Sequence, residues 1–389
     1  MLSAHTTRCR GIRPILAAAV AAGLVGTLLA SPAGQSSPKE PASIADSLTA
    51  LDPRWTVSFE APPAAPAGFD AGAAYVPLRN GDLVAVDLDT AAIRWTAAVD
   101  ARLSPATGEG LVFTGGNGGV QALNGATGEA TWRVPVPGGL AAALHYDTGW
   151  LIASLEGGDL AAFRASDGTL VWRRALGSTL VAAPAPALDK LYLPLADGRV
   201  HAVNLADGSP VWSRTFTGRV SGLLALDDQI IVGTTGNDVE SLDLRTGRTR
   251  WRWRVGADVV GRASADARHI YFVARDNVVR AVDRRNGNLR WIRPFASRPA
   301  GGPLRVGALV LVPFVSAQIA TFDALTGEAK TAITVAGELG SAPHLRLGAR
   351  PTAPRLITVS REGTLQGFAA RIEPPPAPLA ELPGAKAAP

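Results

Sequence analysis

The 389-residue sequence contains one cysteine, Cys9, and one methionine. A single cysteine cannot form a disulfide within the chain or build a cysteine-based metal site. The fold must therefore be held together by packing, and an apolar share of 47% is large enough for a sizeable core. The 42 glycines and 29 prolines, many between short apolar runs, favour an all-β chain rich in tight turns over a helical one.

The beginning of the chain has the pattern of an export signal. Arginines precede the apolar run PILAAAVAAGLVGTLLA at 14–30, and small residues follow around a cleavage point after Ala33. This run is short for crossing a bilayer, which takes about 20 residues. We therefore expect residues 1–33 to be a cleaved signal peptide, with an uncleaved signal anchor as the alternative. Cys9 precedes the run, so it is not placed as the lipidated cysteine of a bacterial lipoprotein.

Two segments of low complexity flank the central part of the sequence. Residues 34–53 are rich in Ser, Pro and Ala and are predicted to be a flexible linker. Residues 373–389 are rich in Pro and Ala, lack the apolar content of a core and are predicted to be disordered. The folded domain is expected between them, over residues 54–372, and the export signal predicts that it lies outside the cytoplasm.

Tryptophan recurs through this domain with a nearly constant period. Successive members of the series are 37 to 40 residues apart: Trp55, Trp95, Trp132, Trp172, Trp212, Trp251 and Trp291. Aligning on this column gives a fifteen-residue unit, whose complete copies are 81–95, 118–132, 158–172, 198–212, 237–251, 277–291 and 317–331. An eighth copy, 363–371, begins the pattern and then meets the proline tail. A period of about 40 residues is typical of β-propellers.

Each position of the unit has a physical reason. The third position is always aliphatic and the fifth always small, as in a strand buried on both sides. The tenth and eleventh positions read Thr-Gly, Asp-Gly or Asn-Gly in six of the seven complete copies, which indicates a hairpin turn. Another strand pair precedes each unit, which gives four strands per repeat.

The incomplete eighth copy predicts how the ring closes. The copy lacks an outer strand, because the prolines that follow it cannot join a ladder. Residues 54–60, which contain Trp55, read as an outer strand with nothing before it. We therefore predict an all-β, eight-bladed propeller of four-stranded antiparallel blades, with the N-terminal strand completing the last blade.

The unit resembles the PQQ-like repeat, and the stretches LDLRTGRTRW and VNLADGSPVW carry the resemblance most clearly. The match extends over nearly all of residues 54–372. In that family the tryptophan docks between neighbouring blades, so the resemblance implies a blade-docking role for Trp55, Trp95, Trp132, Trp172, Trp212, Trp251 and Trp291. Thr331 stands where an eighth tryptophan would fall and implies a less firmly held seventh blade.

The same resemblance bears on cofactors and partners. Quinone-dependent alcohol dehydrogenases of the family carry adjacent cysteines and a calcium site, and this chain has no cysteine after its signal. No cofactor and no enzymatic activity are therefore expected. A lone eight-bladed propeller behind an export signal is similar to the BamB-type component of the outer-membrane β-barrel assembly machinery, which is a noncatalytic scaffold. The resemblance implies a location in the periplasm or an association with the outer membrane, although the missing lipidation cysteine departs from that pattern.

Candidate catalytic and metal-binding residues are few. His145, His201, His269 and His344 lie in different repeats and share no column, so they predict no metal site. Acidic or amide residues recur in the seventh column and are expected to cap strand ends: Asp87, Asn124, Asn204, Asp243, Asp283 and Asp323.

Positive charge is concentrated in one part of the chain. Residues 245–305 contain 15 Arg, no Lys and four acidic residues, a net charge of +11 against +5 for the whole chain. At its centre, RTRWRWRV (248–255) places alternate arginines on one face of a strand, Arg248, Arg250, Arg252 and Arg254.

This strand has two interpretations. Its arginines could dock an acidic partner protein or an anionic lipid, since the guanidinium suits carboxylates and phosphates. Alternatively, they are a solvated outer strand whose charges prevent edge-to-edge pairing. Nucleic acid is not expected behind an export signal. The domain is expected to be a monomeric propeller.

Two classes of function remain at this point. The first is a noncatalytic envelope scaffold. The second is an exported propeller that binds a small ligand, such as a sugar, or acts as a quinone- or metal-dependent enzyme through its central channel.

Overall fold

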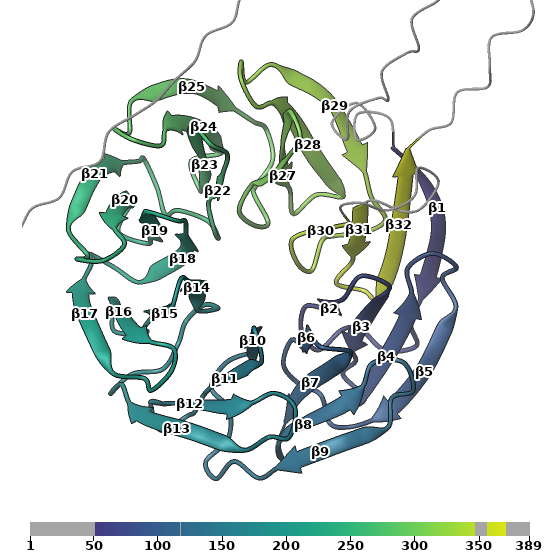
Figure 1. Cartoon of the computed structure of the whole chain (residues 1–389). Helices are drawn as coiled ribbons and strands as arrows, with labels where there is room; N and C mark the ends of the chain where they lie inside the picture. Colours follow the sequence, from purple (N-terminus) through teal and green to yellow (C-terminus); the bar gives the residue numbers. More distant parts are fainter. Residues whose placement is uncertain (1–50, 117, 347–355, 371–389) are drawn as a thin grey trace, which may run out of the picture. The chain divides into compact units, whose positions relative to one another are not determined.

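The computed structural model describes residues 51–116, 118–346 and 356–370, and none of these residues lies in a helix. They form eight four-stranded antiparallel sheets arranged in a ring (Figure 1). The prediction of an eight-bladed β-propeller is therefore confirmed. The predicted signal at 1–33 and tail at 373–389 lie outside the described residues.

Blades are numbered here in chain order, and each runs from an inner strand to an outer strand. Blade 1 contains β2 Gly68–Phe69, β3 Ala73–Pro77, β4 Asp82–Asp87 and β5 Ile93–Ala98. Blade 2 contains β6 Ala106–Gly108, β7 Leu111–Gly116, β8 Gly119–Asn124 and β9 Ala130–Val134. Blade 3 contains β10 His145–Asp147, β11 Trp150–Ser154, β12 Asp159–Arg164 and β13 Leu170–Ala175. Blade 4 contains β14 Ala185–Ala187, β15 Lys190–Pro194, β16 Arg199–Asn204 and β17 Pro210–Thr215.

The second half of the ring repeats this order. Blade 5 contains β18 Val220–Ala225, β19 Gln229–Thr234, β20 Asp238–Asp243 and β21 Thr249–Arg254. Blade 6 contains β22 Ser264–Ala265, β23 His269–Ala274, β24 Val278–Asp283 and β25 Leu289–Pro294. Blade 7 contains β26 Leu304–Val306, β27 Leu309–Pro313, β28 Gln318–Asp323 and β29 Ala329–Thr334. Blade 8 contains β30 His344–Leu345, β31 Leu356–Val359, β32 Thr364–Ala370 and β1 Leu51–Ser58.

The last blade is completed from the other end of the described chain. β1 pairs antiparallel with β32, from Leu51 opposite Ala370 to Ser58 opposite Thr364. β1 begins at Leu51, three residues before the start of the domain predicted at residue 54. The strand passes through Pro53 because it lies at the sheet edge, where a missing N–H costs no ladder bond. Leu51 packs on the apolar cluster between blades 7 and 8, which anchors this end of the strand.

The core lies between neighbouring blades. The aliphatic third position of the repeat is at most 1% exposed in every blade, at Leu83, Val120, Leu160, Val200, Val239, Val279, Ile319 and Leu365. Each apolar cluster joins strands of two adjacent blades; one cluster combines Tyr75 of β3 with Val112 of β7. No blade buries its two sides alone, so stability requires the complete ring.

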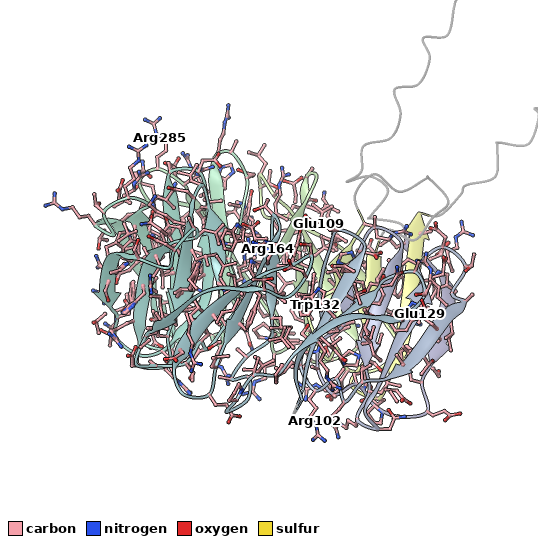
Figure 2. All side chains as sticks on the ribbon, turned by 60° about the horizontal axis from the view of Figure 1, so that its bottom comes forward. Arg102, Glu109, Glu129, Trp132, Arg164 and Arg285 are labelled. Carbon is pink, nitrogen blue, oxygen red and sulfur yellow. The ribbon has the colours of Figure 1, made fainter. Side chains whose placement is uncertain are left out.

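The antiparallel order gives the ring two different faces. Turns between first and second strands and between third and fourth strands lie on one face, named here the turn face. Turns between second and third strands lie on the other, together with the linkers between blades, and this is the linker face. Figure 2 labels Arg285 on the turn face and Arg102 on the linker face.

Polar residues in the seventh column shape the turns that follow β4, β8, β20, β24 and β28. In each of these turns one side-chain oxygen accepts hydrogen bonds from the two backbone N–H groups two and three residues later, at Asp87, Asn124, Asp243, Asp283 and Asp323. Asn204 instead donates its amide to the Ser209 hydroxyl. The predicted capping role of this column is confirmed for these five residues and not for Asn204.

Candidate functional site

Six of the predicted tryptophans form the same contact with the next blade. The indole N–H donates to a backbone carbonyl just after the third strand of that blade, at N–O distances of 2.8 to 3.2 Å. The donor and acceptor pairs are Trp95 and Gly125, Trp132 and Ala165, Trp172 and Leu205, Trp212 and Leu244, Trp251 and Arg284, and Trp291 and Ala324.

Each of these indole rings lies over a glycine of the neighbouring hairpin turn. These glycines have φ between 67° and 76°, and a Cβ on any of them would come within 2.6 to 2.9 Å of the tryptophan ring: Gly128, Gly168, Gly208, Gly247, Gly287 and Gly327. Glycine therefore serves both the left-handed turn and the close approach of the ring.

Three buried tyrosines reinforce the same contacts, and the sequence reasoning did not find them. The Tyr192 hydroxyl donates to the Leu244 carbonyl that Trp212 also binds, at 3.1 Å. The Tyr75 and Tyr271 hydroxyls lie 3.2 and 3.1 Å from the carbonyls bound by Trp95 and Trp291, and each donates more closely to a carboxylate, Asp70 at 2.6 Å and Asp266 at 2.7 Å. Burial raises the pKa of Tyr192 to about 12. Each tyrosine is the third residue of the second strand of its blade. This recurrence is visible in the sequence when the repeats are aligned beyond the fifteen-residue unit.

Trp55, at the interface of blades 8 and 1, departs from this arrangement. Its indole N–H is buried and has no partner among the described residues, and its ring lies against Gly367 of its own blade. The turn position that is glycine in the six interfaces described above is Ala91 here, with φ of 63°. A Cβ there occupies the space that the ring takes elsewhere, which explains the different placement of Trp55.

At this interface an arginine, rather than a tryptophan, donates to the carbonyl that follows the third strand of the next blade. The Arg346 guanidinium donates to the Leu88 carbonyl at 3.5 Å, to the Ala71 carbonyl at 2.9 Å and to the Asp89 carboxylate at 2.7 Å. Leu88 occupies the position of the carbonyls that the tryptophans bind in other blades. The closing interface is thus held by a charge-assisted contact.

The predicted arginine strand is β21, which contains Arg250, Arg252 and Arg254 and follows directly after Arg248. Two of these four arginines form ion pairs within blade 5. The Arg252 guanidinium binds both carboxylate oxygens of Asp238, whose side chain is 2% exposed, at 2.6 and 3.1 Å. Arg250 lies 2.6 Å from the Asp228 carboxylate and 3.0 Å from that of Asp243. These contacts neutralise both arginines and fix their side chains.

The other two predicted arginines have no ion-pair partner among the described residues. Arg248 and Arg254 are exposed, and neither forms an ion pair within the part of the chain that the structure describes. The alternation of exposed and buried side chains holds from Trp251 to Val255, but Arg250 lies in a bulge of the β20–β21 pair.

The four histidines remain apart, in blades 3, 4, 6 and 8. His344 stacks on Phe69 with ring centroids 4.1 Å apart, and burial, with Arg346 nearby, lowers its pKa to about 4. Burial also lowers the pKa of His145 and of His201. Among the described residues, no three His, Cys, Asp or Glu side chains gather as they would to hold a metal ion.

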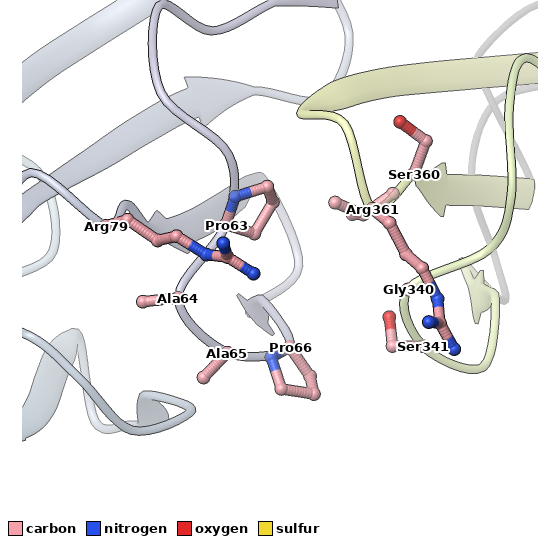
Figure 3. A pocket seen from close by; sticks show the side chains of 10 residues that line it. Pro63, Ala64, Ala65, Pro66, Arg79, Gly340, Ser341, Ser360 and Arg361 are labelled. Carbon is pink, nitrogen blue, oxygen red and sulfur yellow. The ribbon is translucent and has the colours of Figure 1, made fainter.

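Two adjoining pockets on the linker face bring four exposed arginines together. The first has a volume of about 250 Å³ between blades 8 and 1, and Arg79 and Arg361 project into it from two sides (Figure 3). The second has a volume of about 440 Å³ and is lined by Arg275, Arg298 and Arg361. Arg361 belongs to both. These four residues are named the arginine arc.

The sequence reasoning missed the arc, although a signal for it exists. Arg79, Arg275 and Arg361 occupy the same position in the turn between second and third strands of blades 1, 6 and 8. This position lies just upstream of the fifteen-residue unit, so the columns of that unit do not include it. Arg298 lies on the linker before blade 7.

The sequence of the whole ring can now be compared with known proteins. A family model described as "Outer membrane protein assembly factor BamB" matches residues 45–142, 116–219 and 196–365. Its three overlapping matches extend over all eight blades. The chain belongs to this BamB family. The predicted resemblance to PQQ-like repeat propellers of the BamB type is therefore confirmed.

Solved structures agree with the BamB-family fold. The crystal structure of BamB from Moraxella catarrhalis matches with a TM-score of 0.69 at 18% identity and covers 82% of this chain and 99% of its own. Sqt1 from Saccharomyces cerevisiae matches with a TM-score of 0.70 at 12% identity, covering 82% of this chain and 98% of its own. A quinohemoprotein alcohol dehydrogenase from Comamonas testosteroni matches with a TM-score of 0.69 at 14% identity. The match covers 90% of this chain and 80% of the dehydrogenase chain. At these identities the likeness concerns the fold. A search of curated protein sequences found no match.

The last of these neighbours raises the question of a quinone cofactor in this BamB-family chain. Calcium takes oxygen ligands from carboxylates, carbonyls and amides. Among the described residues, no three His, Cys, Asp or Glu side chains gather in one place, and Cys9, the sole cysteine, lies outside these residues.

The described residues contain no helix with the length and apolar character needed to cross a membrane.

Proposed function

We propose that this BamB-family propeller is a noncatalytic, exported scaffold that binds partner proteins in the cell envelope during assembly of outer-membrane β-barrel proteins. The observation that carries the proposal is the family match, which spans residues 45–365 and so the whole ring. The pattern of the export signal supports a periplasmic location.

The geometry of the ring supports a structural role for the tryptophan column in this scaffold. We assign blade docking to Trp95, Trp132, Trp172, Trp212, Trp251 and Trp291 because each binds a carbonyl of the next blade. Trp55 docks by apolar contact alone, since it packs on the cluster between blades 8 and 1 without a hydrogen bond among the described residues.

The surface at β21 remains a candidate for partner docking, but only two of its four predicted arginines are available. Arg248 and Arg254 keep free guanidinium groups that an acidic partner could bind. Arg250 and Arg252 serve the blade itself, because they neutralise carboxylates of the same sheet.

Chemical crosslinking of intact cells that express the chain, followed by mass spectrometry, tests the proposal. We expect subunits that insert β-barrels into the outer membrane among the crosslinked partners. Their consistent absence, with other envelope proteins captured in the same samples, would contradict the assembly role.

The second class of function is an exported ligand-binding or enzymatic propeller. The observation that favours it is the structural likeness to a quinohemoprotein alcohol dehydrogenase. Dye reduction by the purified chain, supplied with the quinone, calcium and an alcohol, would support this class over the scaffold.

A further inference from the structure

The arginine arc is built on a backbone hydrogen bond that recurs around the linker face. In each case the N–H of a residue in the turn between second and third strands donates to a carbonyl of the preceding linker. The N–O distances are 2.8 to 3.0 Å for Arg79 and Pro62, Arg275 and Asp258, Arg361 and Glu338, and Val315 and Arg298. Blades 1, 6 and 8 thus carry arginine on the turn side of this bond, and blade 7 carries it on the linker side.

Blades 3, 4 and 5 form the same backbone hydrogen bond between turn and linker, but they carry fewer arginines at its two positions. Glu156, in the turn of blade 3, bonds to Gly139, and Ala196, in the turn of blade 4, bonds to Thr179. In blade 5, Arg219 takes the linker position, but it lines neither of the two pockets. The propeller therefore gathers four arginines in one sector of this face, around two pockets whose lining contains no Asp or Glu.

The guanidinium groups of this sector are largely uncommitted. Within the described ranges, the side chains of Arg79 and Arg298 form no hydrogen bond or ion pair, and Arg361 donates only to the Leu339 carbonyl at 3.4 Å. Arg275 lies 3.9 Å from the Asp258 carboxylate, and both side chains are about half exposed. All four arginines are exposed. This contrasts with Arg250 and Arg252, whose charges are already matched.

We propose that the arginine arc binds an acidic, extended segment of a partner protein. Guanidinium groups form paired hydrogen bonds with carboxylates. Between the arginines, the second pocket offers small apolar surfaces at Val260, Pro299, Ala300 and Val315, which suit apolar side chains alternating with Asp or Glu. The arc spans four consecutive blades, so it fits a segment better than a single small anion.

The surroundings of the arc favour a peptide over a lipid surface. Proteins that bind membranes through basic residues usually add apolar side chains that insert beside the headgroups. Among the described residues, the large exposed hydrophobic side chains lie elsewhere, and none lines either pocket.

This inference rests on the proposed role as a protein-binding scaffold and gives the chemistry of one partner segment. Binding is measured with the purified full chain and a fluorescent peptide of alternating Glu and Leu, by fluorescence anisotropy at low and at physiological salt. A peptide with Gln in place of every Glu is the chemical control. We expect the Glu peptide to bind more tightly, with an affinity that falls as salt rises.

Three variants assign the binding to the arc. Arg298→Glu and Arg361→Glu should each weaken binding of the Glu peptide by about ten-fold or more. Arg219 is exposed and accepts the same backbone hydrogen bond as Arg298, but it lines neither pocket. Arg219→Glu should therefore leave the affinity within about two-fold. Arg298→Gln is the variant least able to disturb the fold, since its side chain has no described partner, and it should also weaken binding.

The outcomes separate the inference from the proposed function. Equal binding of the Gln peptide, or equal loss in the Arg219 variant, would overturn the inference. Binding of anionic phospholipid vesicles that is lost in the arc variants, without any binding of the Glu peptide, would overturn it in favour of lipid. If the cellular crosslinks to barrel-insertion subunits persist in an Arg298→Glu, Arg361→Glu double variant, the scaffold role stands and the arc is not its docking surface.

Discussion

The glycine of the hairpin turn connects the repeat pattern with contact between blades at the scale of single residues. Gly168 and Gly177 have nearly the same φ, 72° and 71°, but their surroundings differ. A Cβ on Gly168 would lie 2.6 Å from the Trp132 ring, whereas a Cβ on Gly177 would meet no atom within 4 Å.

This pair gives a matched prediction. Gly177→Ala should lower the free energy of unfolding by about 1 kcal/mol, the cost of the left-handed conformation. Gly168→Ala should lower it by about 1–3 kcal/mol more, because Trp132 must move. Urea unfolding of both variants measures the difference. Equal losses would mean that the ring does not depend on this close approach.

Much of this residue-scale pattern was predictable. The tryptophan column and the glycine turns follow from the period and from turn chemistry, which are local properties. The exception at Trp55 was not predictable, because it depends on how closely the Trp55 ring and the Cβ of Ala91 approach each other once β1 has joined blade 8. The Arg346 contact to the Leu88 carbonyl depends on the same closure of the ring.

The outer strand β21 shows what determines charge at the scale of an element. The sequence window 245–305 has a large positive charge, but the carboxylates that neutralise Arg250 and Arg252 come from Asp228, Asp238 and Asp243, just upstream of that window. Which arginine meets which carboxylate depends on the register of β20 and β21, including the bulge at Arg250. The charged strand was therefore predictable and its pairing was not.

Two arginines of β21 provide the prediction at this scale. Arg252→Ala leaves the buried Asp238 carboxylate without its partner and should lower the free energy of unfolding by about 1–3 kcal/mol. Arg254→Ala removes an exposed charge of the same strand that has no described partner, and the change should stay within about 0.5 kcal/mol. Chemical denaturation at neutral pH compares them. A larger loss for Arg254→Ala would contradict the assignment of Arg252 to the blade and Arg254 to the surface.

At the scale of the whole molecule, closure by β1 removes a free edge from blade 8. A chain that lacks residues 1–58 would expose the unpaired edge of β32, which is a template for pairing with another chain. We expect this truncation to oligomerise or aggregate and to unfold at lower temperature than a chain that begins at residue 51. Light scattering coupled to size exclusion measures the first effect. A monomer of unchanged thermal stability would contradict the closure.

The functional surface belongs to this scale as well. Arg79 and Arg361 lie near opposite ends of the domain in sequence, and both line the same pocket because the ring brings blades 8 and 1 together. The number of blades could be counted from the sequence, but the arc could be recognised only after the turns of three blades and the linker that carries Arg298 had been placed on one face.

The central claim, that this BamB-family chain is a protein-binding scaffold for outer-membrane assembly, is tested most directly by photo-crosslinking in living cells. A photoreactive residue is placed at Ala296, which is exposed beside Arg298 on the linker face, or at Arg285 on the turn face, each in the full chain. We predict an adduct with a β-barrel assembly subunit from position 296 and none from position 285. No adduct with such a subunit from either position, while both chains fold and are exported, would contradict the account.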